Sequence, residues 1–136
     1  MLKVINLKIG EMSSDDLCAV FEDNMLAKDS IISLDRDDIY QLKEPQHQYL
    51  SLFSFTYDSY EELEVCFHDL FIGLQDEVAA CATYLTTLEN ASLDEFESYC
   101  KLLTFSIGES RILTGLSMGK SNSVNLFLLH SKPIDN

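Results

Sequence analysis

The feature that most constrains the fold is a run of apolar residues between Leu63 and Leu88 that recur every three or four positions. This spacing places the residues on one face of an α-helix. Ser59 and Glu62 precede the run with the spacing of a capping box. We therefore expect a helix that runs to about Glu89, or one that is interrupted near Gly73. Its apolar face would consist of Leu63, Phe67, Leu70, Leu74, Val78, Cys81, Leu85 and Leu88.

A second capping box, from Ser92 to Glu95, predicts another helix directly afterwards. Only Asn90 and Ala91 separate the two predicted helices, so we expect a helical hairpin. The face of the second helix would consist of Leu93, Phe96, Cys100, Leu103 and Ile107.

Three segments have the composition of β-strands. Residues 2–9 are partly alternating and β-branched, and residues 124–130 resemble them. In residues 49–57 the aromatic side chains fall on one face, while Leu50 and Leu52 fall on the other. Since both faces are partly apolar, we expect this strand in the middle of the sheet. Residues 111–118 fit a strand or a helix equally well.

The remaining N-terminal segments are shorter. Ser13 or Ser14 can cap a helix whose apolar face consists of Leu17, Val20, Phe21 and Leu26. Ile31, Ile32 and Leu34 suggest a short strand, and Asp35 to Asp38 a turn, so residues 39–42 could return as the hairpin partner. The expected fold is α+β, with a small mixed or antiparallel sheet packed against the long helical hairpin and one N-terminal helix. We expect a single domain, residues 1–136, with a short tail from about 131 to 136.

The charge distribution limits the partners of such a chain. The formal net charge is −14, from 23 acidic and 9 basic residues. Residues 44–100 contain 12 acidic residues and no Lys or Arg. Nucleic acids and anionic membranes would be repelled, whereas a basic macromolecule would be attracted. Solubility alone is the alternative explanation of this acidity.

The four cysteines, Cys18, Cys66, Cys81 and Cys100, form no CxxC pair. Each lies on or beside an apolar helical stripe, which is typical of buried free thiols. Residues 1–10 lack the pattern of a signal peptide, and no apolar run reaches the length of a membrane span. We therefore expect a protein of the reducing cytoplasm.

No catalytic or metal-binding motif is convincing. Asp35 to Asp38 begin like a calcium loop, but Tyr40 and Gln46 occupy the places of its Gly and Glu. Glu64 and His68 share a helical face but have no second ligand pair. Residues 115–119 match G-x-S-x-G without the following acid and histidine in order. Cys66 and His68, two positions apart, point to different sides of a helix. We expect no catalytic residue, metal or cofactor.

The first functional hypothesis is an acidic protein-binding inhibitor, of the immunity, antitoxin or nucleic-acid-mimic type, that neutralises a basic partner such as a nuclease or a nucleic-acid-binding protein. Acidic residues recurring every seven positions would align along the long helix. The expected contacts are Glu62, Asp69, Asp76 and Glu77, with the aromatic anchors Tyr60 and Tyr84. The alternative is a small acidic secretion chaperone, a homodimer that binds an effector segment by strand addition. An enzyme is the third hypothesis.

Overall fold

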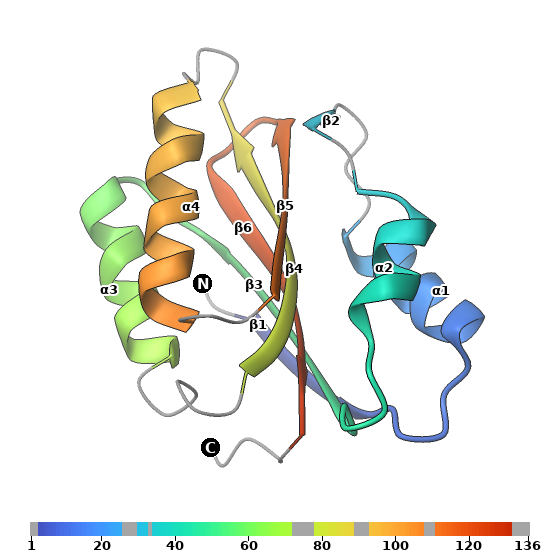
Figure 1. Ribbon diagram of the computed structural model, residues 1–136. Helices are drawn as coiled ribbons and strands as arrows, with labels where there is room; N and C mark the ends of the chain where they lie inside the picture. The colour runs from blue at the N-terminus through green and yellow to red at the C-terminus, as the bar shows by residue number, and fades with distance from the viewer. Residues whose placement is uncertain are drawn as a thin grey trace.

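A mixed sheet of six strands lies between two pairs of helices in the computed structural model (Figure 1). The structure describes residues 3–25, 30–32, 34–71, 78–88, 93–107 and 111–131. α3 (Tyr60–Phe71) and α4 (Leu93–Ile107) cover one face of the sheet, and α1 (Ser14–Met25) and α2 (Arg36–Leu42) cover the other. The α+β class is confirmed, but the arrangement differs from the expected one because each face carries a pair of helices.

The order of the strands places the N-terminal segments at both edges of the sheet. Across the sheet the order is β1–β3–β6–β4–β5–β2. β4 and β5 are parallel and are joined through α4, whereas every other neighbouring pair is antiparallel. The bounds of the strands are β1 (Lys3–Lys8), β2 (Ser30–Ile32), β3 (Tyr49–Thr56), β4 (Val78–Thr87), β5 (Arg111–Met118) and β6 (Ser123–His130).

The expectation of a helix running to about Glu89 is wrong. α3 ends at Phe71, and Val78–Thr87 form β4. β4 is an inner strand with apolar residues on both faces, because Cys81 and Leu85 join the core under α3 and α4 while Ala82 and Tyr84 join the opposite core. A strand buried on both faces reads as a continuous apolar run, and such a run also contains helical spacings. Gly73, the predicted point of interruption, lies outside the described residues.

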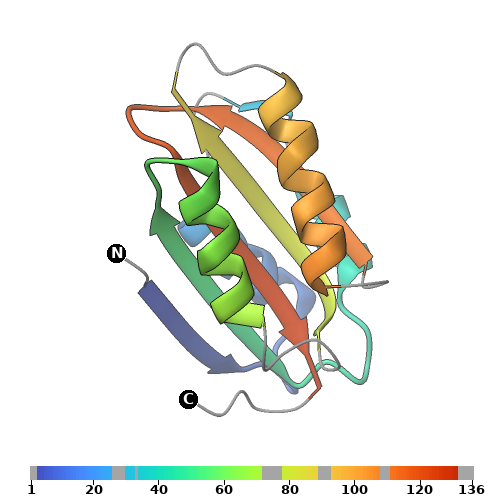
Figure 2. The same cartoon turned by 90° about the vertical axis from the view of Figure 1, so that its left-hand side faces the viewer.

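The expected helical hairpin is also wrong, although its two helices do lie next to each other. α3 and α4 are side by side on the sheet and run in the same direction (Figure 2). β4 runs between them in the chain. The two helices therefore belong to successive helix–strand units, and each packs its own apolar face on the sheet.

Arg36–Leu42 form a helix, capped by Asp35, instead of the expected turn and returning strand. The Asp38 amide donates to the side chain of Asp35 at 3.0 Å, and the Asp35 amide donates to the side chain of Asp38 at 2.9 Å. This reciprocal pair is a capping box for α2. Ile39 and Leu42, three positions apart, are the buried residues of this helix.

The strands with clear alternation occur where the sequence predicts them. β3 is an inner strand: Phe53 and Phe55 face α3 and α4, while Leu50 and Leu52 face α1 and α2. β1, β2 and β6 are confirmed as strands, and residues 111–118, left open by the sequence, form β5. No helix in the described ranges is both long and apolar enough to cross a membrane.

Candidate protein-binding face

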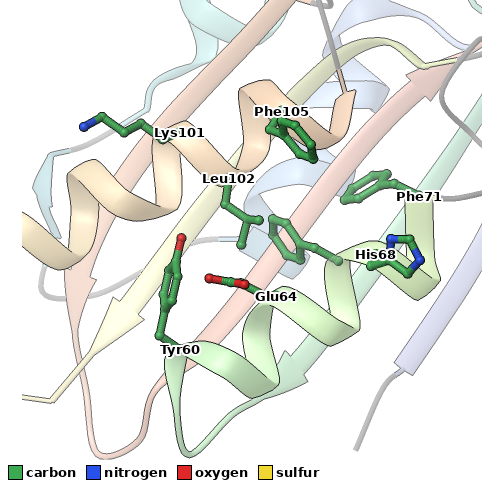
Figure 3. Close-up of a pocket in the computed structure, with 8 residues that line it drawn as sticks. Tyr60, Glu64, His68, Phe71, Lys101, Leu102 and Phe105 are labelled. Carbon is green, nitrogen blue, oxygen red and sulfur yellow. The ribbon is translucent and has the colours of Figure 1, made fainter.

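A groove of about 510 Å³ separates α3 from α4 on the outer side of the molecule (Figure 3). Its floor is apolar, because Phe67 and Phe71 are buried and Leu102 is partly buried against the same core. At one end the Tyr60 hydroxyl reaches α4 and donates to the backbone oxygen of Ser98 at 3.3 Å. The complete lining is Tyr60, Glu64, Phe67, His68, Phe71, Lys101, Leu102 and Phe105.

Large apolar side chains are exposed on the two helices that form this groove. Phe105 is 86% exposed, Leu93 is 70% exposed and Val65 is 60% exposed. With Tyr60, they make four of the seven exposed large hydrophobic residues in the described part of the chain. Scattered single apolar residues are ordinary on a protein surface, but a concentration on one face marks an interaction site. We name the outer surface of α3 and α4, with this groove, the acidic helical face.

The charges of the acidic helical face have almost one sign. Described residues of α3 and α4 include one lysine, Lys101, whose Nζ lies 3.2 Å from Glu97 Oε1. Acidic residues in a first helical turn interact favourably with the helix dipole. That argument covers Glu61, Glu62, Asp94 and Glu95. It does not cover the remaining acids, which are Glu64, Asp69 and Glu97.

The residues predicted from sequence are only partly brought together. Tyr60, Glu62 and Asp69 are exposed on α3. α3 ends at Phe71, and Asp76 and Glu77 lie outside the described residues, so the structure describes only Glu62 and Asp69 of the predicted line of carboxylates.

Tyr84 is not an exposed anchor. It is only 3% exposed and packs beside Phe21 in the core under α1 and α2. Its hydroxyl oxygen accepts a hydrogen bond from the Leu34 amide at 2.6 Å. The prediction for Tyr84 is wrong because a residue of an inner strand faces one of two cores, whereas the assumed helix had a solvent side.

The most exposed apolar residue of the face, Phe105, was missed by the sequence reasoning. Its signal was an exception to a pattern: Phe105 does not fit the apolar spacing of Phe96, Cys100 and Leu103 on α4. Leu93, assigned to the buried face, is in fact exposed. Glu64 was considered only as a metal ligand, and it lines the groove with His68.

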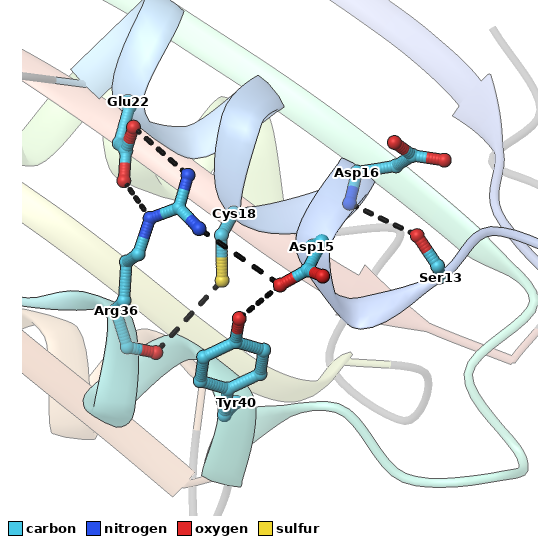
Figure 4. A network of polar contacts seen from close by, with 7 residues as sticks. All are labelled: Ser13, Asp15, Asp16, Cys18, Glu22, Arg36 and Tyr40. Atoms are coloured by element: carbon cyan, nitrogen blue, oxygen red, sulfur yellow. Dashed lines mark hydrogen bonds and ion pairs between the residues drawn. The ribbon is translucent and has the colours of Figure 1, made fainter.

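A second polar cluster joins α1 to α2 on the opposite side of the molecule (Figure 4). Arg36 binds both carboxylate oxygens of Glu22, and Tyr40 donates to Asp15. The hydrogen bond from Arg36 lowers the pKa of Glu22. Beneath this cluster Cys18 is buried. The cluster holds two helices together, but its single guanidinium faces two carboxylates, so this side of the molecule is acidic as well.

A serine and a histidine meet at the end of β3 and β6, but not as a nucleophile and its base. The Ser51 hydroxyl donates to Asn6 Oδ1 at 2.7 Å. His130 Nε2 lies 2.9 Å from the hydroxyl oxygen of Ser51. With the single hydroxyl hydrogen directed to Asn6, the Ser51 oxygen is the acceptor for a proton on His130 Nε2. Both residues are buried, and the arrangement is that of a structural hydrogen-bond network.

The other motifs weighed in the sequence have structural roles. Ser117 of the G-x-S-x-G match is buried in β5, with its Oγ 2.7 Å from Thr86 Oγ1. Asp35 and Asp38 cap α2. All four cysteines lie in described positions and are free thiols. Within the described ranges, no group of three or more His, Cys, Asp or Glu side chains is arranged to hold a metal ion.

Comparisons with known proteins assign no family. No family model and no curated protein sequence matches the chain. CetZ from Methanosaeta thermophila is 16% identical with a TM-score of 0.43, over 60% of this chain and 27% of its own. Thiamine-monophosphate kinase from Stenotrophomonas maltophilia is 15% identical with a TM-score of 0.41, over 96% of this chain and 44% of its own. This chain thus spans less than half of either protein, and neither likeness bears on its function.

Proposed function

We propose that this chain is an acidic protein-binding inhibitor that docks a basic protein, such as a nuclease or a nucleic-acid-binding protein, on the acidic helical face. The observation that carries the proposal is the coincidence of exposed apolar anchors with nearly uncompensated negative charge on α3 and α4. Apolar side chains at the centre of an interface supply most of the affinity. Surrounding charges of one sign accelerate association with an oppositely charged partner.

The electrostatic part of this proposal follows from the position of the acids. Each of the seven acids on α3 and α4 is exposed, so each is accessible to a partner in this conformation. Like charges on one surface repel one another, and a basic partner relieves that repulsion. The acids are Glu61, Glu62, Glu64, Asp69, Asp94, Glu95 and Glu97.

Docking on helices accounts for these features better than strand addition, which the secretion-chaperone alternative requires. β1 is an edge strand that pairs only with β3 among the described strands. The exposed Lys8 stands at its end, and a lysine on an edge strand opposes pairing with another chain. A homodimer in solution would be the first observation in favour of the chaperone. The four free thiols fit a protein of the reducing cytoplasm, which we propose as its compartment.

The proposal is tested by capture from the native host with the parent chain and a charge variant. The variant carries Glu61→Gln, Glu62→Gln and Asp69→Asn, three exposed positions of α3. We expect the parent to retain a protein of basic pI whose own activity falls when the chain is added. Retention should weaken at least ~10-fold between about 50 mM and about 500 mM salt, because salt screens charges on exposed surfaces.

A matched control removes the same number of acidic charges elsewhere. Glu11→Gln, Asp23→Asn and Asp37→Asn are exposed positions outside the acidic helical face. This control should retain the partner nearly as well as the parent. Equal losses in the two variants, or a retained protein of acidic pI, would refute docking on this face.

A further inference from the structure

One carboxylate of the acidic helical face stands inside the groove. Glu64 lies on α3 between Tyr60 and His68 at four-residue spacing, and it lines the groove together with Leu102 of α4 (Figure 3). Burial raises the pKa of Tyr60, and the charge of Glu64, one turn further along α3, adds to that rise. Among the described residues Glu64 forms no ion pair.

The lysine of the groove does not neutralise this carboxylate. Lys101 lines the groove, but its ammonium group pairs with Glu97 on the same helix at 3.2 Å. In Figure 3 the lysine side chain extends away from Glu64. The groove therefore presents a carboxylate without an ion pair to a described residue above a floor of Phe67, Phe71 and Leu102, and His68 is the other basic residue of the lining.

The walls of the groove favour a flat cation. Tyr60 and the exposed Phe105 present aromatic rings at its rim. A guanidinium group stacks on aromatic rings and can donate two parallel hydrogen bonds to one carboxylate. An ammonium group is more strongly hydrated and makes neither the flat stack nor the paired hydrogen bonds. The size of the groove, about 510 Å³, is within the range of pockets that hold small ligands.

We infer that the groove between α3 and α4 is a receptor for an arginine side chain of the bound protein, with Glu64 as the carboxylate and Tyr60 and Phe105 as the aromatic walls. This inference rests on the proposed function and names the residue of the partner that enters the acidic helical face. The aliphatic part of the arginine would lie on Phe67, Phe71 and Leu102.

The experiment uses the full chain and a probe that does not require the partner. N-acetyl-arginine-N-methylamide is titrated into isotopically labelled protein, and the signals of Phe105 and Phe67 are followed by NMR. The citrulline analogue has nearly the same shape without the charge, and the lysine analogue has the charge without the flat shape. We expect the arginine probe to bind at least ~5-fold more tightly than either analogue, because only its guanidinium can form the bidentate contact.

Two pairs of variants locate the site. Glu64→Gln should weaken binding of the arginine probe at least ~5-fold, whereas Glu61→Gln, the same change one turn earlier and outside the groove lining, should weaken it less than ~2-fold. Phe105→Ala should weaken binding, and Leu93→Ala, an exposed truncation on the same helix, should not.

Equal affinities for arginine and citrulline, or equal effects of the two glutamate variants, would overturn the arginine receptor. Such a result leaves the proposed function standing if capture of a basic protein still depends on salt and on the charges of α3. Loss of capture with a selective arginine site would instead refute the inhibitor and keep the site.

Discussion

The hydroxyl of Tyr99 donates a hydrogen bond to Thr83 Oγ1 at 2.6 Å in the core between α4 and β4. Thr83 uses its own hydrogen for the backbone oxygen of Asn125, at 2.7 Å, so the direction of both bonds is fixed. Tyr99 and Thr83 are fully buried. The chain of two bonds links one helix to the two central strands.

Removing the Thr83 hydroxyl should therefore destabilise the fold more than removing the Tyr99 hydroxyl. Thr83→Val leaves the buried Tyr99 hydroxyl without this acceptor and the Asn125 carbonyl without its donor, which should lower the free energy of unfolding by about 1–3 kcal/mol. Tyr99→Phe removes only the terminal donor and should cost about 1 kcal/mol. Urea denaturation measures both, with Tyr60→Phe, which removes a longer and solvent-exposed hydrogen bond of 3.3 Å, as the control. Equal costs for Thr83→Val and Tyr99→Phe would contradict this assignment.

The stability of the fold should fall in acid through His47. Its Nδ1 accepts a hydrogen bond from the Glu44 amide at 2.9 Å, and its buried Nε2 has no hydrogen-bond partner within the described residues. Burial lowers the pKa of His47, so the unfolded chain takes up the proton first. Stability is then complete above the ordinary histidine pKa of about 6.5 and decreases as the pH falls below it.

Urea denaturation between about pH 7.5 and about pH 5 tests this dependence. His47→Asn keeps an acceptor near the Glu44 amide but cannot be protonated in this range. The variant should lose less stability in acid than the parent. An identical pH dependence for both proteins would assign the acid sensitivity to other groups.

The free thiols should differ in their reaction with an alkylating reagent. Cys18 and Cys81 are buried, and burial raises the pKa of both thiols. Cys66 and Cys100 are only partly buried. Since the thiolate is the reactive form and must be accessible, Cys81 should be modified only when the chain unfolds. Mass spectrometry of peptides after brief iodoacetamide treatment checks the order, and modification of Cys81 as fast as Cys66 would contradict it.

Gly119 is required by the side chain of Thr86. A Cβ at position 119 would lie 2.8 Å from Thr86 Cγ2, while the Gly119 amide donates to the Thr87 carbonyl at 2.8 Å. Gly119→Ala should therefore destabilise the fold by about 1–3 kcal/mol, the usual cost of overpacking. Adding Thr86→Ser removes the methyl group and keeps the hydroxyl that contacts Ser117, so the double variant should recover part of the loss in thermal denaturation. Failure of this rescue would show that the backbone, not the methyl group, is the constraint.

The sequence predicts an element correctly where its residue pattern fits only one kind of secondary structure. β3 shows different residue types on its two faces, and Ser13 and Ser59 cap α1 and α3 through their hydroxyls. β4 is not predictable in this way, because a strand buried on both faces satisfies helical and strand spacing together. α2 is short, and its seven residues fit a turn and strand as well as a capped helix.

The candidate site was predictable in its charge but not in its geometry. The excess of acids in residues 44–100 identifies the region, and Tyr60, Glu62 and Asp69 do lie exposed on α3. The groove depends on the packing of two helices that are separated by β4, so Phe105 and Glu64 line one groove only in the folded chain. No local pattern in the sequence predicts this groove.

The strand order also affects folding during synthesis on the ribosome. β1 can pair with β3 early, since Lys8 opposes Tyr49. β2, made next, must wait for β5, where Ser30 opposes Ser117. Phe127 and Leu129, which complete the core beneath α1, emerge later still. The first third of the chain therefore cannot complete its packing until nearly all of residues 1–131 have been synthesised. During that interval its apolar residues depend on protection from aggregation.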